Sequence, residues 1–538
     1  MIRTLASALA LASALAVSAQ AQTTSPTERA QRAARWWGDI AALADDANEG
    51  RLTGTAGYRR AEAYVIERMK AEGLKPAGEK GGFTQAVGFR EQVVDQAAST
   101  AVLTKADGTV DTLKVGGDLT VAAGGAPRPK TVDAPLVFVG YGLHMPERGH
   151  DDFKGLDLKG KIVVAIAGGP ADLPGTEKAS ARNERNKVLA RMGAVGVIAI
   201  TPPKQVEIPW ARATVLAKGA GMFLADAALR DTPDGLYTAT FDPAQGARLF
   251  AGSGHDYAEI AALSDASKPI AGFDMKTRLK ATTATEFHDL TSDNIIGVLP
   301  GSDPKLKGEY VALSAHLDHL GTGVGADGKR FIYPGAMDDA SGVASLLDIV
   351  RTLKAGPPLK RSILVVVVTA EEKGLLGSHY FANRPTMPKA SLVADLNFDM
   401  PLPLWTLKTV LAQGEYESTL GAQARESAAE QGLALTPDPL PDRNSFVRTD
   451  QYSFVKQGLP SLAFKFGFQK DTPEFETERL WRANRYHAAG DDLNQPVMKE
   501  EAIKLNDVVA GIARRVANAD ERPQWLETSG FRKFAAPK

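Results

Sequence analysis

The sequence predicts a doubly wound α/β fold, in which a mostly parallel sheet carries helices on both of its faces. Strand-like and helix-like segments alternate regularly from residue 310 to residue 517. Residues 362–369 are a nearly continuous run of Ile, Leu and Val, which is typical of a central parallel strand covered on both sides. Residues 341–354 place their apolar side chains on one helical face. In such a fold the functional site lies beyond the carboxyl ends of the strands.

The N-terminal part is expected to begin with two amphipathic helices. Residues 25–48 and 58–72 carry apolar side chains at helical spacing, and Gly73 is a suitable C-cap for the second helix. Residues 83–121 alternate polar and apolar side chains as strands do. The Gly- and Pro-rich segment 124–129 then breaks the pattern and predicts a linker.

A short series of two strands, a helix and a third strand follows this linker. The strands are expected at 136–142, 159–167 and 195–200, and the helix at 183–192. This order predicts a small compact domain inserted into a larger one. The remaining elements are strands at 273–290, 310–315, 392–398 and 461–466, a new run of strands from Asn294, and a closing helix at 500–517.

The length of 538 residues exceeds what a single hydrophobic core usually serves. We therefore expect a catalytic domain divided between residues 22–126 and 271–520, with an inserted domain at 127–270 and a C-terminal tail at 521–538.

The first 21 residues resemble a secretory signal peptide. A positive segment at residues 1–3 precedes an uninterrupted run of apolar and small residues from Leu5 to Val17, and Ala19-Gln20-Ala21 forms an Ala-x-Ala cleavage site. The run is too short and too rich in Ala for a transmembrane anchor. No later segment reaches the roughly 18 apolar residues that a spanning helix requires. We expect a periplasmic or secreted bacterial protein.

The charge balance excludes some partners. The 63 Lys and Arg residues nearly equal the 64 Asp and Glu residues, and no block of like charges occurs. A nucleic acid or an anionic membrane is therefore not an expected partner. The chain has no cysteine, so an exported form must rely on packing and bound metal rather than on disulfides.

Imidazoles and carboxylates recur at the ends of the predicted strands. Hydrolysis of an amide at neutral pH needs a nucleophile stronger than water, and two divalent ions about 3.5–4 Å apart can provide it by lowering the pKa of a shared water. Glu371, beside a ligand glutamate, can take the proton from that water. The carboxylate of Asp318 can accept the second imidazole N–H of His316 and so orient its ring. The expected ligands are His316, Asp338, Glu372, Asp399 and His487.

Each of these patterns also has a structural explanation. A His-x-Asp sequence is often a surface pair, Glu-Glu after a strand often starts a helix, and Asp-Asp before Ala-Ser-Gly is a good N-cap. The order of the patterns and their shared position at strand ends favour function. We expect His319 and His379 to be structural. The Gly323-x-Gly325-x-x-Gly328 match to a dinucleotide-binding motif follows no strand, so we reject it.

These motifs together resemble a known family. Ala315-His-Leu-Asp318, Gly335-Ala-Met-Asp-Asp339-Ala-Ser-Gly342, Thr369-Ala-Glu-Glu372, Phe398-Asp399 and Tyr486-His487 resemble the di-zinc exopeptidases, a family that includes bacterial leucyl aminopeptidases, aminopeptidases S and Y, and glutamate carboxypeptidase II. The loop from Gly50 to Thr55 belongs to the same resemblance. The inserted segment is similar to a protease-associated domain, notably at Gly140-Tyr-Gly142 and Lys159-Gly-Lys-Ile-Val-Val.

The resemblance implies a role for each ligand. Asp338 would bridge two zinc ions and would be joined to Asp339 by a cis peptide bond. His316 and Asp399 would complete one metal site, and Glu372 and His487 the other. Glu371 would act as general base and then acid, and Asp318 would orient His316. The segment at Asp450 resembles a stretch that lies near the substrate in this family, but Thr449 and Gln451 depart from its pattern. Met337 is not expected to touch a metal.

The resemblance implies a zinc exopeptidase that acts on peptides, and we favour an aminopeptidase. The first alternative is a carboxypeptidase of the glutamate carboxypeptidase type, in which an arginine such as Arg443 or Arg212 would hold a terminal carboxylate. The second is a binding protein with an inert site, which the presence of all five ligands and Glu371 disfavours. A glutaminyl cyclase, which binds one zinc, is also disfavoured.

Overall fold

A computed structural model describes residues 25–535 except 123–126, 207, 232–233 and 326–327. A mixed sheet of 16 strands runs through the whole molecule. Its main path begins at β19 (Ala434–Leu435) and is ordered β19-β18-β20-β17-β13-β16-β12-β5-β8-β9-β11-β4. Hydrophobic clusters fill both ends of this sheet. The predicted signal peptide at residues 1–21 lies outside the described residues. Among the described helices, none combines the length and apolar character needed to cross a membrane.

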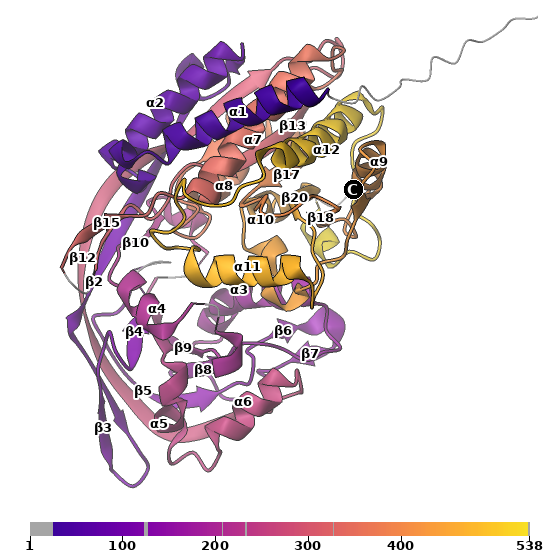
Figure 1. The fold of residues 1–538 in the computed structure, drawn as a ribbon. Coiled ribbons are helices and arrows are strands. Elements are labelled where there is room, and N and C mark those ends of the chain that lie inside the picture. Colours follow the sequence, from indigo (N-terminus) through magenta and orange to yellow (C-terminus); the bar gives the residue numbers. More distant parts are fainter. Residues whose placement is uncertain (1–24, 123–126, 207, 232–233, 326–327, 536–538) are drawn as a thin grey trace, which may run out of the picture.

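The upper part of the molecule in Figure 1 is the predicted doubly wound α/β unit. Its centre consists of four neighbouring parallel strands, β20 (Ser461–Phe466), β17 (Leu392–Phe398), β13 (Tyr310–His316) and β16 (Ser362–Val368). Every residue of β16 is buried, as its continuous apolar sequence predicts. The antiparallel strands β18 (Thr409–Gln413) and β12 flank this centre.

Helices cover both faces of these strands, so the predicted architecture is confirmed. The helices α1 (Pro26–Leu43), α7 (Ser341–Ala355) and α12 (Lys499–Asn518) pack together on one face, and α8 (Leu376–Asn383) and α10 (Gln451–Val455) pack on the other. Helix α2 (Ala56–Ala71) ends next to Gly73, the residue predicted to end it, and Gly73 takes a positive φ of 78°.

A buried ion cluster joins the three helices of the first face. The guanidinium of Arg32 in α1 donates to Asp348 of α7 from Nε at 3.1 Å and from Nη2 at 2.7 Å. Its Nη1 donates to Asp507 of α12 at 2.6 Å. The side chain of Arg32 is 5% exposed, so one guanidinium pairs with two carboxylates away from water, and Arg351 lies 3.7 Å from Asp348 as a second cation.

Two long antiparallel strands form the left edge of Figure 1 and connect the upper part to the lower part. The strand β12 (Phe273–Leu299) pairs with β2 (Thr84–Thr104) over most of its length. It also pairs with β5 (Thr131–Phe138) near its beginning and with β16 at its end. The sequence suggested two separate strand segments here, at 273–290 and from Asn294. The structure has one continuous strand.

The lower part has a core of its own, and we call the residues that form most of it, 131–265, the 131–265 region. Its parallel strands are β5, β8 (Ile162–Ile166), β9 (Gly196–Ile200) and β11 (Tyr237–Phe241), and β4 (Leu119–Val121) is antiparallel to β11. The remaining elements of the lower part are the helices α3 (Gly175–Arg191), α4 (Trp210–Leu216), α5 (Gly246–Phe250) and α6 (Tyr257–Asp265), the hairpin β6 (His144–Met145) and β7 (His150–Asp151), and the strands β3 (Val110–Leu113) and β10 (Gly221–Leu224), which pair with β2. The sequence places the helix at 183–192, but α3 begins two turns earlier. The assignment of these residues to a protease-associated domain stays a prediction.

The last described residues, expected as a tail, pack onto the upper part. Phe531, in the short helix η11 (Gly530–Phe534), is buried against Phe446 and Trp525. The indole of Trp525 donates to the main-chain oxygen of Gly458 at 2.9 Å. Burial of these aromatic rings fixes the segment to the rest of the chain.

Candidate metal centre

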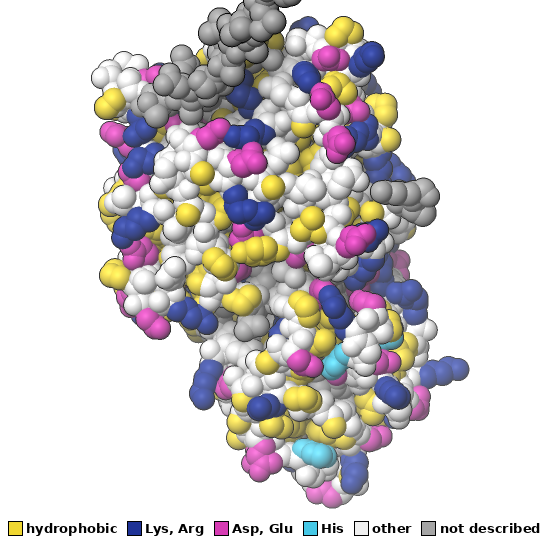
Figure 2. Space-filling view, turned by 90° about the vertical axis from the view of Figure 1, so that its right-hand side faces the viewer, with side chains coloured by type: hydrophobic (Ala, Val, Ile, Leu, Met, Phe, Trp, Pro, Cys, Tyr) yellow, Lys and Arg dark blue, Asp and Glu magenta, His cyan; other side chains and the backbone are white. Residues whose placement is uncertain are grey.

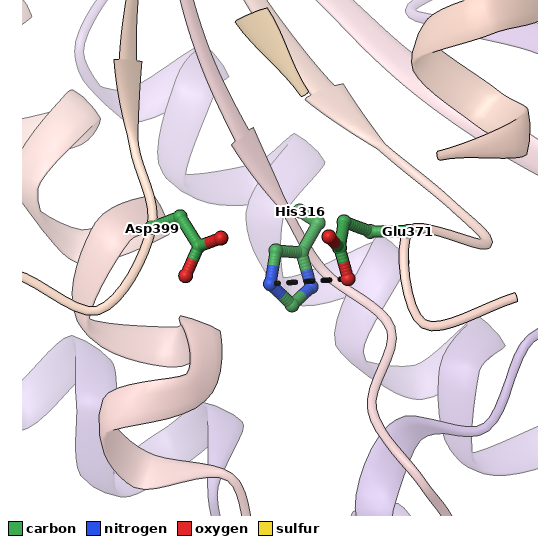
Figure 3. A group of neighbouring side chains, drawn as sticks. All are labelled: His316, Glu371 and Asp399. Atoms are coloured by element: carbon green, nitrogen blue, oxygen red, sulfur yellow. Dashed lines mark ion pairs between the residues drawn. The ribbon is translucent and has the colours of Figure 1, made fainter. Parts of the chain in front are cut away.

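Three adjacent parallel strands deliver the first group of predicted residues to one place. His316 is the last residue of β13, Glu371 follows β16, and Asp399 follows β17. Figure 3 shows the three side chains pointing from the ends of these strands into a common space. The carboxyl ends of neighbouring parallel strands meet at one edge of a sheet, so this convergence is what the sequence predicts.

Asp338 lies at the centre of the cluster. Its Oδ1 lies 3.2 Å from Nε2 of His316, and its Oδ2 lies 3.3 Å from Nε2 of His487. The same nitrogen of His487 lies 3.1 Å from Oε2 of Glu372. The five predicted ligands and Glu371 are therefore brought together, although His487 comes from a distant loop.

The spacing of these atoms fits zinc. Two ligand atoms bound about 2.0–2.1 Å from one tetrahedral ion lie about 3.3 Å apart. The three contacts above, at 3.1 to 3.3 Å, agree with this value. Within the described part of the chain, three of the buried ligand atoms make no hydrogen bond of ordinary geometry, and they are Nε2 of His316, Oδ2 of Asp338 and Oδ1 of Asp399. Buried polar atoms of this kind require a partner, and a cation would provide one.

His319 also lies in the cluster, which the sequence interpretation missed. Its Nδ1 is 2.7 Å from Oε1 of Glu372 and 3.9 Å from Oδ2 of Asp338. These three residues form a group that could hold a metal ion, as do His316, Glu371 and Asp399. The repeated imidazole in His316-Leu-Asp-His319 was a signal that could have indicated this role. His379, in contrast, has Nε2 only 2.8 Å from the main-chain oxygen of Leu229 and lies outside both groups.

Asp318 contacts its neighbours differently from the prediction. The Nδ1 atom of His316 lies 3.0 Å from the main-chain oxygen of Asp318, not from its carboxylate. The carboxylate accepts hydrogen bonds from the main-chain N–H groups of Glu371, at 3.0 Å, and Glu372, at 3.3 Å. Asp318 thus holds the histidine with its backbone and the two glutamates with its side chain.

Two buried residues fix the loops that carry the ligands. The guanidinium of Arg51 donates to the main-chain oxygens of Leu317 at 2.8 Å and of Gly335 at 2.9 Å. The carboxylate of Asp491 accepts from the N–H groups of Met337 and Asp338, both at 3.0 Å. Both Arg51 and Asp491 are fully buried. The peptide bond between Asp338 and Asp339 is cis, as the resemblance implies.

The electrostatics of the cluster favour a bound cation. Burial would lower the pKa of His487, but Glu372 and Asp338 raise it to about 10. Burial, together with nearby carboxylates, raises the pKa of Glu371 well above its usual value. Four carboxylates converge here, on Asp338, Glu371, Glu372 and Asp399, and a divalent ion would relieve their mutual repulsion.

The segment around Asp450 supports the site from behind. Asp450 is fully buried, and burial together with the charge of Asp399 raises its pKa to about 7. The side-chain amide of Gln451 donates to the main-chain oxygen of Phe446 at 2.7 Å, and Thr449 donates to Gln451. Gln451 therefore stabilises the turn before α10. Met337 is buried and contributes only its main chain to the contacts described above.

Comparison with known proteins identifies the upper part. Residues 294–513 match the profile of Peptidase family M28. "Aminopeptidase YwaD" of Bacillus subtilis (strain 168) is 26% identical over 248 residues, which cover 45% of this chain and 48% of that protein. "Probable leucine aminopeptidase 2" of Aspergillus fumigatus is 27% identical over 241 residues, which cover 43% of this chain and 45% of that protein. The chain thus spans about half the length of these relatives.

The fold also matches a solved structure. An aminopeptidase from Aneurinibacillus sp. strain AM-1 superimposes with a TM-score of 0.52 at 18% identity, over 91% of this chain and 95% of that one. This likeness concerns the fold. The matched segment 294–513 contains every residue of the cluster described above. The segment 294–513, less than half of the chain, therefore carries the sequence profile of Peptidase family M28.

Proposed function

We propose that this protein is a zinc-dependent exopeptidase, and specifically an aminopeptidase that removes N-terminal residues from peptides. The convergence of five ligand side chains, with Asp338 at their centre and Glu371 beside them, carries this proposal. The names of its relatives, an aminopeptidase and a leucine aminopeptidase, support it.

The proposed centre holds two zinc ions. Asp338 contacts one histidine with each carboxylate oxygen, as a bridging ligand would. His316 and Asp399 would complete the ligand set of one ion, and Glu372 and His487 would complete that of the other. His319 lies next to Glu372, and its Nδ1 contacts Oε1 of that glutamate.

Glu371 is proposed to move the proton. Zinc ions, when bound, would lower the pKa of a water and polarise the scissile carbonyl. Glu371 would take a proton from the attacking water, whose oxygen bonds to the carbonyl carbon, and would deliver that proton to the leaving nitrogen as the C–N bond breaks. Burial raises the pKa of Glu371, which suits a group that must both accept and donate. Asp318 holds the main chain of Glu371 in place.

The test combines metal analysis with two matched variants. The purified protein should contain about two zinc ions per chain and should hydrolyse aminoacyl-p-nitroanilides until a chelator is added. Glu371→Gln should keep its zinc and lose about 10²- to 10⁴-fold in kcat. Glu372→Gln should lose zinc. The proposal fails if the protein binds no zinc or turns over no exopeptidase substrate, and an exchanged pattern in the two variants would mean that their roles are reversed.

A carboxypeptidase is the second candidate, and one observation favours it. Arg443, Arg448 and Arg482 line the same small pocket as Asp338 and Glu371, where they could hold a terminal carboxylate. Arg212 instead donates to the main-chain oxygen of Ala483. A panel of peptides with free and blocked N-termini separates the two activities, because an aminopeptidase requires a free amine.

We further propose that the protein is exported to the periplasm or the medium. The apolar run and the Ala19-Gln20-Ala21 site support this proposal. N-terminal sequencing of protein from the producing bacterium should start at Gln22. A start at Met1 in that protein would contradict export by this route.

A further inference from the structure

A large cavity adjoins the proposed metal centre. It has a volume of about 970 Å³ and is lined by α3 of the 131–265 region, by the loop at 440–448, and by α11 (Pro473–Asn484) of the upper part. This volume is in the range of pockets that hold small-molecule or short peptide ligands. A smaller pocket of about 50 Å³ contains Asp338 and Glu371 and shares Arg443, Arg448 and Arg482 with the larger cavity. The three arginines therefore lie where the two spaces meet.

Basic side chains outnumber acidic ones in the wall of the larger cavity, although some of them are ion-paired, as Arg479 is with Glu476 and Lys204 with Asp265. Among the described residues that line it, the acidic side chain is Asp265, and seven side chains are basic. The basic residues are Lys178, Arg182, Lys204, Arg443, Arg448, Arg479 and Arg482. The whole chain has a net charge of −1, and the face shown in Figure 2 mixes acidic and basic side chains. The positive charge is thus a local property of this cavity, where protein walls focus its field.

Two of the three arginines at the junction, Arg443 and Arg482, are held in place by neighbouring side chains. Glu478, which is 2% exposed, contacts Nη1 of Arg443 at 2.7 Å and also contacts Arg482. The guanidinium of Arg482 lies 5.2 Å from the centre of the Tyr486 ring. Such fixed guanidinium groups lose little entropy when they bind a carboxylate through two parallel hydrogen bonds.

The opposite wall is attached to the same loop. Asn183 of α3 donates to the main-chain oxygen of Val447 at 3.1 Å, and Ser180 of α3 lies within 3.0 Å of the hydroxyl of Tyr452. Lys178 and Arg182 of α3 line this wall, where they donate to the main-chain oxygens of Pro170 at 3.0 Å and Gly168 at 3.2 Å. Compensation of the carboxylates in the metal centre would explain basic side chains at the junction. It does not explain basic side chains on the far wall, which line the larger cavity and not the small pocket.

We propose that this cavity binds a negatively charged part of the peptide beyond the scissile bond, so that the enzyme prefers short anionic peptides. The carboxylate could be the C-terminus of the peptide or the side chain of an Asp or Glu residue. This inference rests on the proposed peptidase function and specifies its substrate class.

The test uses four peptides that share one N-terminal residue. Leu-Ala-Glu-Glu and Leu-Ala-Gln-Gln are each prepared with a free C-terminal carboxylate and with a C-terminal amide. Release of Leu gives kcat/KM for each peptide, and titration into the Glu371→Gln variant gives its affinity without turnover. We expect about 10-fold or greater preference for the most anionic peptide over the uncharged amide, with the difference mainly in KM.

Matched variants locate the effect. Arg182→Gln and Arg479→Gln, at residues that line the larger cavity and not the small pocket, should each reduce the preference for the anionic peptide several-fold and leave hydrolysis of neutral Leu-p-nitroanilide within about 2-fold. Arg515→Gln, on the outer face of α12, should change neither. A preference that follows only the C-terminal carboxylate, or only the acidic side chains, supports the proposal and identifies the source of the charge.

Two results overturn the inference. Equal kcat/KM and equal affinity for all four peptides would show that the cavity does not discriminate between peptides by their charge. An unchanged preference in both cavity variants would show that the charge is read elsewhere. If Leu-p-nitroanilide is hydrolysed while either result is obtained, only the inference fails. If no substrate is hydrolysed, the proposed function fails as well.

Discussion

The Nδ1 atom of His319 lies 2.7 Å from Oε1 of Glu372, and the two side chains are 0% and 4% exposed. At this distance the imidazole either fixes the glutamate or shares an ion with it. Both arrangements make metal binding depend on His319.

The first prediction concerns His319→Ala. Loss of an imidazole that fixes a metal ligand typically weakens metal affinity by about 10- to 100-fold. We expect a loss of this size for zinc, measured by competition with a chromophoric chelator. His379→Ala is the matched control, because it also removes a buried imidazole but lies outside the two metal-binding groups. Equal zinc affinity in His319→Ala and the wild type would show that His319 only fills space.

The second prediction concerns the stability of the helical face that carries α1. Arg32→Met would leave Asp348 and Asp507 buried without their shared counter-charge. Breaking a buried ion cluster in this way costs about 3–5 kcal/mol. The free energy of unfolding, obtained from urea titration, should fall by this amount. Arg515→Met removes a more exposed pair with Glu426 and should cost less than about 1 kcal/mol. Similar losses in the two variants would contradict the buried-charge explanation.

The third prediction concerns pH and Asp231, which joins the two parts of the molecule. Its carboxylate lies 2.7 Å from Nζ of Lys456 in the upper part and 3.1 Å from Nζ of Lys187 in α3. Burial alone would raise the pKa of Asp231, but Lys456 and the other nearby positive charges lower it below its usual value. The ionised form is therefore favoured in the folded protein.

A depressed pKa stabilises the fold above the unfolded-state value of about 3.9, and this contribution is lost as the pH falls below it. Asp231→Asn should consequently lower the Tm at pH 7, and the difference from wild type should shrink between pH 5 and pH 3. In a Lys456→Met background the same substitution should have a smaller effect at every pH. A difference in Tm that does not change with pH would exclude this ion pair as its source.

The sequence predicted the parts of the fold in which one pattern dominates. The nearly continuous apolar run at 362–369 and the amphipathic segment 341–354 correspond to β16 and α7. The continuous strand β12 was harder to predict, because the polar residues 291–293 separate its two predicted segments. The buried amide of Asn294, next to them, donates to the side chain of Gln85 and to the main-chain oxygen of Gly377, both at 3.0 Å. Such long-range partners are not visible in a local pattern.

The metal-site residues were predictable because their chemistry and order are distinctive, whereas their precise contacts were not. The sequence does not show that the main chain of Asp318 faces His316 while its carboxylate faces the glutamates, since this depends on how β13 and β16 align. The N-terminal turns of α3 were missed for a related reason. Their polar residues pack on the loop at 441–448 rather than on an apolar core.

The pairing of β2 with β12 has a mechanical consequence. A strand of 27 residues is about 90 Å long when extended, and both parts of the molecule hydrogen-bond to it directly. Because strands of both parts pair with β12, the connection between the two parts resists bending at any single residue, unlike a flexible linker. The gap between α3 and α11 is then set by the curvature of the sheet rather than by a hinge. We expect the fixed width of the cavity between these two helices to limit the width of the peptides that can enter it.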